Sequence, residues 1–307
     1  MIRRPVPWPN GAKVAIAITF DVDCDSSIHL SFPKDAINRV STLSMFRYDP
    51  EVAVPRILET YRRFGLKQTF MVPAWCIEQY PHMVDAIVKD GHEVGFHGYI
   101  HEGPNTLSRE EEQYWLRRSI EVIQKHTGKR PRGSRSPGHC ISINTPDLLV
   151  EEGFLYDSTL QGDEVPYILE TKKGSLVELP SHMGLDDWTF YAYIGDFNHL
   201  MQIMTPDRAM EVYMADFEAL RQCGGGLWVT LWHPFLSGRL ARWLRVERMI
   251  EQMMATGEVW FATMEEIANH VNDCRKKGTY EPRVDKLPFY DKPVAINRPS
   301  FGTAPVN

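Results

Sequence analysis

The 307-residue chain lacks several features that would assign it to a large class of proteins. It has no Cys-x-x-Cys pair, and its five cysteines are an odd number, which favours free thiols over a disulfide framework. No apolar run is long enough to cross a membrane. The segment Met1–Pro5 contains two arginines, but no apolar stretch follows it, so we expect no secretory signal. Together these absences predict a cytoplasmic protein.

Basic charge and nucleotide-binding motifs are also missing. The formal net charge is −6, so we expect neither a nucleic acid nor a membrane surface as a partner. No Gly-x-Gly-x-x-Gly follows the first predicted strand, and no Gly-x-x-x-x-Gly-Lys-Ser/Thr occurs anywhere. The sequence therefore gives no support for a flavin or nucleotide enzyme.

What the chain does have is an alternation of short apolar segments with amphipathic ones. The first apolar segment, Val14–Phe20, is typical of a central strand in a parallel sheet. About seven strand-then-helix repeats extend to Asn272, which predicts an α/β fold with right-handed connections. The pattern alone does not separate an open sheet from a closed barrel. In both, the active site lies at the C-terminal ends of the strands.

Two segments depart from this alternation. We expect a single catalytic domain over residues 1–277, followed by an extended arm over 278–307 that contains five prolines and no apolar period. Inside the domain, Cys24–Tyr48 shows no clear periodicity and predicts a long loop. Such a loop beside a site forms a lid or a substrate wall, or else it packs on the surface or against another subunit.

Candidate metal ligands follow two of the predicted strands. His97 and His101 are four residues apart after the predicted strand His92–Phe96, so both imidazoles can reach one ion. A carboxylate pair, Asp21 and Asp23, follows the first strand. Two imidazoles and a carboxylate form a facial ligand set that suits Zn²⁺ or another first-row divalent ion and leaves positions open for water and substrate.

Five motifs occur in an order that resembles the polysaccharide deacetylase family. They are Thr19–Asp23, His97–His101, Arg135–Gly138, Asp157–Ser158 and Leu231–His233. The resemblance covers roughly residues 10 to 270. It implies a distorted (β/α) barrel with fewer than eight strands, a divalent metal cofactor and hydrolysis of carbon–nitrogen bonds other than peptide bonds.

The resemblance also implies roles for individual residues. The family usually has adjacent aspartates, whereas Val22 separates them here; alternate residues of a strand point to the same side, so both can face the site. Asp23 is then the metal ligand with His97 and His101, and Asp21 the general base. Turn capping is the structural alternative for both aspartates.

Three further residues complete the implied machinery. Arg135 would orient Asp21 through a two-pronged hydrogen bond, or it forms a purely structural salt bridge. His233 would be the general acid, unless it is a satisfied core histidine. Asp157 would hold His233 in the useful tautomer. Cys24 and Cys140 lie beside motif residues, but metal-activated water already supplies a nucleophile.

The motifs contain two departures that bear on the substrate. Gly98 stands where the family usually has serine, and His139 stands where it has glycine or asparagine. The segment around residues 178–188 resembles the branch that includes peptidoglycan deacetylases and hydrolases of cyclic imides or allantoin. The predicted substrate-binding residues are Tyr99, Glu178, Asp186, Asp187 and Trp188.

These observations favour a small cytoplasmic amide or cyclic imide as the substrate. Deacetylation of an N-acetylated sugar or peptidoglycan fragment is the alternative. Metal-independent allantoin hydrolysis is disfavoured because all three candidate ligands are present, and a catalytically inactive binding module is disfavoured by the five intact motifs. The proline-rich arm and the resemblance together suggest a homo-oligomer.

Overall fold

The apolar segment Val14–Phe20 lies at the centre of the fold in the computed structural model, which describes residues 1–293. The sequence predicted one continuous strand here, but the segment forms two. β1 (Val14–Ala17) and β2 (Phe20–Asp21) belong to different sheets. Between them, the Thr19 N–H donates to the Thr230 hydroxyl at 2.8 Å, and that hydroxyl donates to the Thr19 carbonyl at 2.9 Å. These bonds hold the chain at the point where it crosses from one sheet to the other.

The larger sheet has the strand order β13-β7-β8-β6-β5-β4-β3-β2, and the smaller has the order β11-β1-β12. Every neighbouring pair in these two sheets is parallel except the β7–β8 hairpin. The remaining strands are β3 (Thr69–Val72), β4 (Glu93–Phe96), β5 (Gly133–Ser134), β6 (Tyr156–Asp157), β7 (Tyr167–Thr171), β8 (Gly174–Glu178), β11 (Gly226–Val229), β12 (Val259–Phe261) and β13 (Val284–Lys286), with a separate hairpin of β9 (Tyr193–Ile194) and β10 (His199–Leu200).

Two isolated parallel bridges join the two sheets. Phe20 pairs with Trp232, and Asp186 pairs with Leu231. The sheets therefore curve towards each other around one axis, and the predicted α/β, barrel-like fold is confirmed. Because the strands are mostly parallel, the residues that follow them gather at one end of this curved wall.

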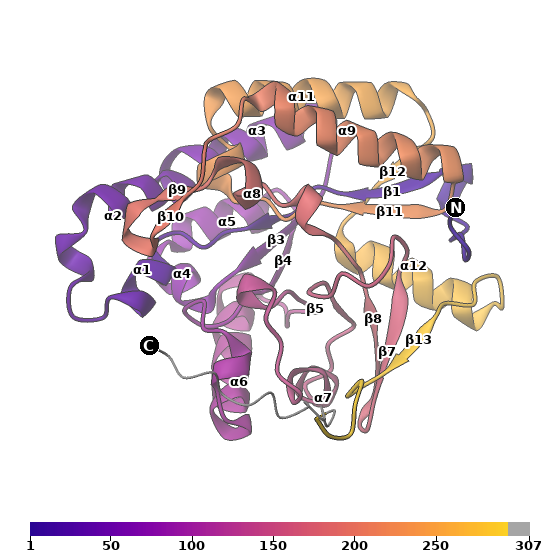
Figure 1. Cartoon of the computed structure of the whole chain (residues 1–307), viewed down its shortest axis with the longest axis horizontal. Coiled ribbons are helices and arrows are strands. Elements are labelled where there is room, and N and C mark those ends of the chain that lie inside the picture. Colours follow the sequence, from indigo (N-terminus) through magenta and orange to yellow (C-terminus); the bar gives the residue numbers. More distant parts are fainter. Residues whose placement is uncertain (294–307) are drawn as a thin grey trace, which may run out of the picture.

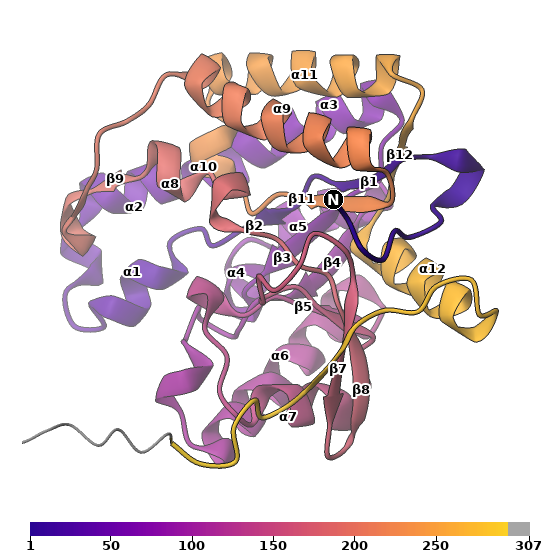
Figure 2. The same cartoon turned by 45° about the vertical axis from the view of Figure 1, so that its right-hand side comes forward.

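Helices cover the outside of the sheets (Figures 1 and 2). In Figure 1, α3, α9 and α11 lie over the smaller sheet, and α6 and α7 lie at the opposite side of the molecule. The longer helices are α3 (Val54–Phe64), α5 (Pro81–Lys89), α6 (Arg109–Thr127), α9 (Pro206–Cys223), α11 (Leu240–Ala255) and α12 (Met264–Lys276). A capping box of Ser108 and Glu111 begins α6.

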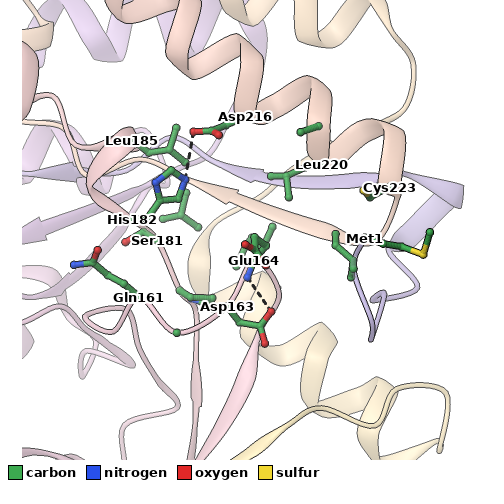
Figure 3. Close-up of a pocket in the computed structure, with 16 residues that line it drawn as sticks. Met1, Gln161, Asp163, Glu164, Ser181, His182, Leu185, Asp216, Leu220 and Cys223 are labelled. Carbon is green, nitrogen blue, oxygen red and sulfur yellow. Dashed lines mark hydrogen bonds and ion pairs between the residues drawn. The ribbon is translucent and has the colours of Figure 1, made fainter.

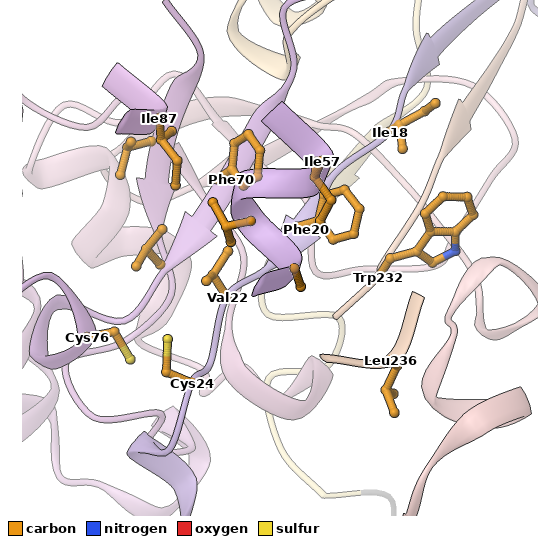
Figure 4. Packing of buried hydrophobic residues seen from close by; sticks show 14 of the residues in the cluster. Ile18, Phe20, Val22, Cys24, Ile57, Phe70, Cys76, Ile87, Trp232 and Leu236 are labelled. Carbon is orange, nitrogen blue, oxygen red and sulfur yellow. The ribbon is translucent and has the colours of Figure 1, made fainter. Parts of the chain in front are cut away.

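Aromatic packing fixes the strand that carries the two aspartates. Phe20 stacks on Phe70 with ring centroids 5.8 Å apart, and it meets the edge of Trp232 at 6.1 Å. Figure 4 shows Phe20 between Ile57 of α3 and Trp232. All four side chains are buried, so β2 cannot shift without opening this cluster.

The segment Cys24–Tyr48 is largely helical, so the prediction of a loop was wrong. It contains α1 (Ser26–Ser31) and α2 (Val40–Phe46), of six and seven residues. Helices this short complete fewer than about two turns, so they leave no clear hydrophobic period in the sequence. Arg39 and Thr42 both donate hydrogen bonds to Asp196, beside the β9–β10 hairpin. The segment thus forms a wall that is tied to that hairpin.

The first part of the predicted C-terminal arm lies on its own domain. There β13 pairs in parallel with β7, with Val284 opposite Ile168. Residues 294–307 of the predicted arm lie outside the described residues. No helix between residues 1 and 293 is both long enough and apolar enough to cross a membrane.

Candidate active site

The three predicted metal ligands meet at the C-terminal ends of β2 and β4. His97 Nε2 lies 3.4 Å from Asp23 Oδ1, and His101 Nε2 lies 3.4 Å from Asp23 Oδ2. One ligand atom from each residue lies within 4.8 Å of the other two. Asp23 Oδ1 is buried and has no hydrogen-bond partner among the residues that the structure describes. A buried carboxylate oxygen left without a donor fits a divalent cation, which would supply the missing partner.

Backbone contacts aim the first imidazole at this point. His97 Nδ1 lies 2.7 Å from the carbonyl oxygen of Arg135, so Nδ1–H donates to it and the Nε2 lone pair is left for an ion. The ring is buried and can adopt few other orientations.

A tight loop places the second imidazole. Gly98 and His101 both have positive φ, +74° and +72°, and the latter is unusual for a residue with a side chain. Inside the loop, the Glu102 carboxylate accepts the N–H of Tyr99 at 2.8 Å and the N–H of Ile100 at 2.7 Å. Sequence reasoning missed Glu102, although it directly follows the histidine motif.

The same carboxylate accounts for the glycine in the motif. A β-carbon on Gly98 would lie 3.4 Å from both Glu102 oxygens and 3.1 Å from Pro137 Cγ. The serine expected at this position would crowd that space. In this chain the polar contact inside the loop comes from Glu102 instead.

Arg135 holds the second aspartate, but not as predicted. Its Nη1 donates to Asp21 Oδ1 at 2.7 Å, whereas Nε and Nη2 donate to the carbonyl and hydroxyl oxygens of Ser158. The expected two-pronged bond to Asp21 is therefore wrong, because Ser158 occupies the other edge of the guanidinium. Burial opposes ionisation of Asp21, but Arg135, His97 and His233 together outweigh it and lower its pKa.

His233 has a carboxylate partner that the sequence assigned to another role. Its Nδ1 lies 2.8 Å from Asp187 Oδ1, and Asp187 Oδ2 accepts the Ser237 hydroxyl at 2.6 Å. The predicted partner, Asp157, instead accepts the N–H and the hydroxyl of Thr159, both at 3.0 Å. The role proposed for Asp157 is therefore wrong.

The order of the strands gives the reason. Asp157 ends β6, and β8 lies next to β6 in the sheet. The chain that leaves β8 reaches Asp186, which bridges to Leu231, and so Asp187 comes to lie beside His233.

Burial acts to lower the pKa of His233, but the hydrogen bond and charge of Asp187 outweigh it and raise the pKa to about 10. The ring is then protonated, with Nε2 lying 3.7 Å from Asp23 Oδ2.

A cavity of about 370 Å³ opens above these groups. Its lining comprises Asp21, Asp23, Ser27, Ser31, His97, His101, Ser136, Gly138, His139, Met183, Asp186, Trp188, Phe197 and His233. Of the predicted substrate-binding residues, Asp186 and Trp188 line it, and Asp187 lies behind His233. Tyr99 and Glu178 are not brought to the cavity: the Tyr99 hydroxyl donates to Glu78 at 2.8 Å, and Glu178 is fully buried, accepting the Leu160 N–H.

A second and larger cavity, of about 630 Å³, lies between α9, β11 and the segment after β8 (Figure 3). His182 and Asp216 form an ion pair of 3.3 Å there. His182 and Leu185 line this cavity, whereas Met183 and Asp186 line the first one, so residues 182–186 form a shared wall. Neither of the candidate metal groups found within residues 1–293 lies in the larger cavity. Chemistry, and not size, therefore selects the smaller one.

Comparison with known proteins gives a consistent set of similarities. Residues 34–156, which include His97, His101 and Arg135, match the family model described as polysaccharide deacetylase. A peptidoglycan deacetylase of Helicobacter pylori is 28% identical over 279 residues, which cover 83% of this chain and 95% of that protein.

Solved structures are similar as well. The crystal structure of a putative polysaccharide deacetylase from Mycobacterium smegmatis has a TM-score of 0.87 and 39% identity, with 94% of this chain and 99% of that chain covered. The crystal structure of Puue allantoinase has a TM-score of 0.77 and 23% identity, with coverages of 89% and 94%, and at this identity it speaks for the fold alone.

Proposed function

We propose that this chain, which belongs to the polysaccharide deacetylase family of hydrolases, uses a divalent metal ion to hydrolyse a small amide or cyclic imide. Zn²⁺ is the first candidate for that ion. The observation that carries the proposal is the convergence of two Nε2 atoms on the two oxygens of Asp23, one of which is buried without a hydrogen-bond partner among the described residues. Asp23, His97 and His101 would hold the ion. When bound, such an ion polarises a substrate carbonyl and lowers the pKa of a water molecule.

Asp21 is the proposed general base. It lines the cavity, and its Oδ2 lies 4.0 Å from His97 Nε2, so the carboxylate faces the space where a water would attack. Arg135 fixes its other oxygen and keeps it ionised. Asp21 takes one proton from the attacking water while the hydroxyl group adds to the substrate carbon.

His233 is the proposed general acid. Asp187 fixes the Nδ1–H, so Nε2 points its proton into the cavity. As the carbon–nitrogen bond breaks, the leaving nitrogen takes that proton. Transfer of the proton held by Asp21 back to His233 restores both groups for the next turnover.

The walls of the cavity support a compact substrate. Its lining includes the aromatic side chains of Trp188 and Phe197 and the hydroxyl groups of Ser27 and Ser31. A volume of about 370 Å³ suits a small ring better than a long polymer. A specific observation favours the alternative: the H. pylori relative is named as a peptidoglycan deacetylase, so an N-acetylated sugar or peptidoglycan fragment is the second candidate substrate.

Two alternatives receive less support. Metal-independent allantoin hydrolysis would leave the cluster of Asp23, His97 and His101 without a use, and the similarity to the allantoinase concerns the fold. An inactive binding module would have no need of both a base and an acid held by their own partners, Arg135 and Asp187.

We also propose a cytoplasmic location and a homo-oligomeric state. All five cysteines are free, and Figure 4 shows the buried Cys24 and Cys76 with their sulfurs facing one another. A reducing compartment would keep this pair as thiols. The support for an oligomer is the proline-rich sequence that follows residue 277.

The test of the substrate class is mass spectrometry of a mixed panel incubated with the zinc-loaded protein. The panel holds cyclic imides, hydantoins, allantoin and N-acetylated glucosamine oligomers. We expect the gain of one water by a cyclic imide. Loss of an acetyl group from a sugar would select the second candidate, and no change in any compound would contradict both.

A further inference from the structure

Two residues of the cavity, His139 and Asp186, are not used by this mechanism. Resting on the proposed function, we propose that they bind the part of the substrate beyond the leaving nitrogen, and that His139 donates a hydrogen bond to a second carbonyl there. His139 thereby selects cyclic imides, in which two carbonyls flank one nitrogen, over simple amides.

The pair lies near the proposed general acid. An oxygen of Asp186 lies within 4.8 Å of a ring nitrogen of His233. His139 Nε2 lies 3.5 Å from Asp186 Oδ2, one step further along the cavity. Asp23, His233, Asp186 and His139 all line the cavity and form a row of neighbours, in which each residue has an atom within 4.8 Å of the next.

Both nitrogens of the His139 ring face oxygen atoms of the protein. Its Nδ1 lies 3.4 Å from the carbonyl oxygen of Thr159, and its Nε2 faces the Asp186 carboxylate. A hydrogen on Nε2 faces the Asp186 carboxylate, whereas a bare Nε2 would set its lone pair against that oxygen. Both contacts are long, so the donor capacity of the ring is poorly used within the protein.

Asp186 is held more firmly than its partner. Its Oδ1 accepts the N–H of Trp188 at 2.8 Å, and the residue is buried. The carboxylate therefore stays in place, and a ligand oxygen that enters the cavity can take the Nε2–H of His139. An N–H or hydroxyl on the same ligand can donate to Asp186 Oδ2.

The backbone at His139 is in an unfavourable conformation. Its φ is +54°, in the left-handed region that costs a residue with a β-carbon about 1 kcal/mol. Gly138, just before it, also has positive φ, and it adopts that conformation without the penalty. Glycine would therefore be more favourable at 139 for the backbone alone. Strain of this kind, in a residue that lines a cavity, indicates that the side chain itself has a use.

The chemistry of an imide matches this row. With the reacting carbonyl near Asp23 and the nitrogen near His233, the second carbonyl extends towards His139. A lactam of the same ring size has a methylene group at that place and offers no acceptor. An N-acetylated sugar presents a ring carbon and hydroxyl groups there, and Asp186 can accept hydrogen bonds from those hydroxyl groups.

The test compares two five-membered rings that differ by one carbonyl, succinimide and 2-pyrrolidinone. For zinc-loaded wild type and His139→Gly, the measurements are kcat/KM for succinimide and the inhibition constant of 2-pyrrolidinone. We expect kcat/KM to fall about 10- to 100-fold, because the second carbonyl loses its donor. The inhibition constant should stay within about twofold. Since glycine suits φ +54°, the variant should unfold at the same temperature as wild type or higher.

His182→Gly is the matched control. His182 belongs to the shared wall of residues 182–186 but lines the other cavity, so both constants should stay at wild-type values. If His139→Gly leaves kcat/KM for succinimide unchanged, the inference is wrong while the proposed function stands. If zinc-loaded wild type neither hydrolyses nor binds succinimide in a calorimetric titration, selection of imides is overturned. Turnover of N-acetylglucosamine oligomers by the same preparation then decides whether the proposed function fails too.

Discussion

The Nδ1 atom of His233 lies 2.8 Å from Oδ1 of Asp187, and its Nε2 lies 3.7 Å from Oδ2 of Asp23. One imidazole therefore connects a fully buried carboxylate to the candidate metal cluster. Asp187 has no exposed surface, and its second oxygen is bound by Ser237, so it cannot itself reach a substrate. Its place behind the ring makes it a positioning residue.

We expect Asp187→Asn to lower kcat about 10²- to 10⁴-fold, because the amide no longer stabilises the protonated ring or fixes the Nδ1–H. Zinc affinity should stay within a few-fold, since Asp187 is not a ligand. Steady-state kinetics and a zinc titration of the same variant separate the two effects. Asp216→Asn is the control, because it alters a similar pair with His182 in the other cavity and should change neither value. A kcat within tenfold of wild type for Asp187→Asn would contradict this role.

Glu102 shapes the loop between the two histidines. We expect Glu102→Ala to weaken zinc binding about 10- to 100-fold, because the N–H groups of Tyr99 and Ile100 lose their acceptor and His101 loses its fixed direction. Glu102→Gln keeps one acceptor oxygen and should lie between Ala and wild type.

Competition with a chromophoric chelator measures these affinities. Glu111→Gln is the matched control, since Glu111 also accepts a backbone N–H, from Ser108, but does so in the capping box of α6. It should cost a little stability and leave zinc binding unchanged. Wild-type affinity in Glu102→Ala would show that the loop keeps its shape without the carboxylate.

The sequence predicted that Asp23, His97 and His101 lie together, because the information for their positions is local. His97 and His101 share one loop after β4, and Asp21 and Asp23 share the end of β2, so the pairing of both strands with β3 was enough to bring them together. Parallel strands place their ends at the same edge, which made this arrangement predictable.

The partner of His233 could not be found in the same way. Asp157 and Asp187 both follow strand-like segments, and only the order of β6, β8 and β11 decides which of them reaches His233. That order depends on tertiary packing and leaves no local pattern. The break between β1 and β2 was hidden for a similar reason: Thr19 reads as part of an apolar run, but its backbone bonds to Thr230.

Glu93 gives the stability a pH dependence that does not involve the active site. Burial raises its pKa to about 7, although Thr69, Tyr156 and the N–H of Glu265 donate to it. The folded state therefore binds this proton more tightly than the unfolded state, in which the pKa is near 4.5. The contribution to stability is full below pH 4.5 and is lost as the pH rises to 7.

We expect the free energy of unfolding of Glu93→Gln, relative to wild type, to rise by about 1–3 kcal/mol between pH 4.5 and 7 and to stay level above that. Urea unfolding at a series of pH values measures it. Burial lowers the pKa of the neighbouring His92 to about 4, so its contribution to the stability of the protein is lost as the pH falls below 6.5. Only the difference between the variant and wild type therefore isolates the effect of Glu93. A difference that is independent of pH would contradict the raised pKa.

The central claim is that hydrolysis depends on a metal held by Asp23, His97 and His101. The most direct measurement is a zinc titration of chelator-treated protein, with bound zinc and hydrolysis of an amide, imide or N-acetyl substrate followed in the same samples. We predict that activity rises in proportion to bound zinc, up to about one ion per chain, and that Asp23→Ala neither binds zinc tightly nor recovers activity. Full activity in the chelated protein, or activity in Asp23→Ala equal to wild type, would contradict the claim.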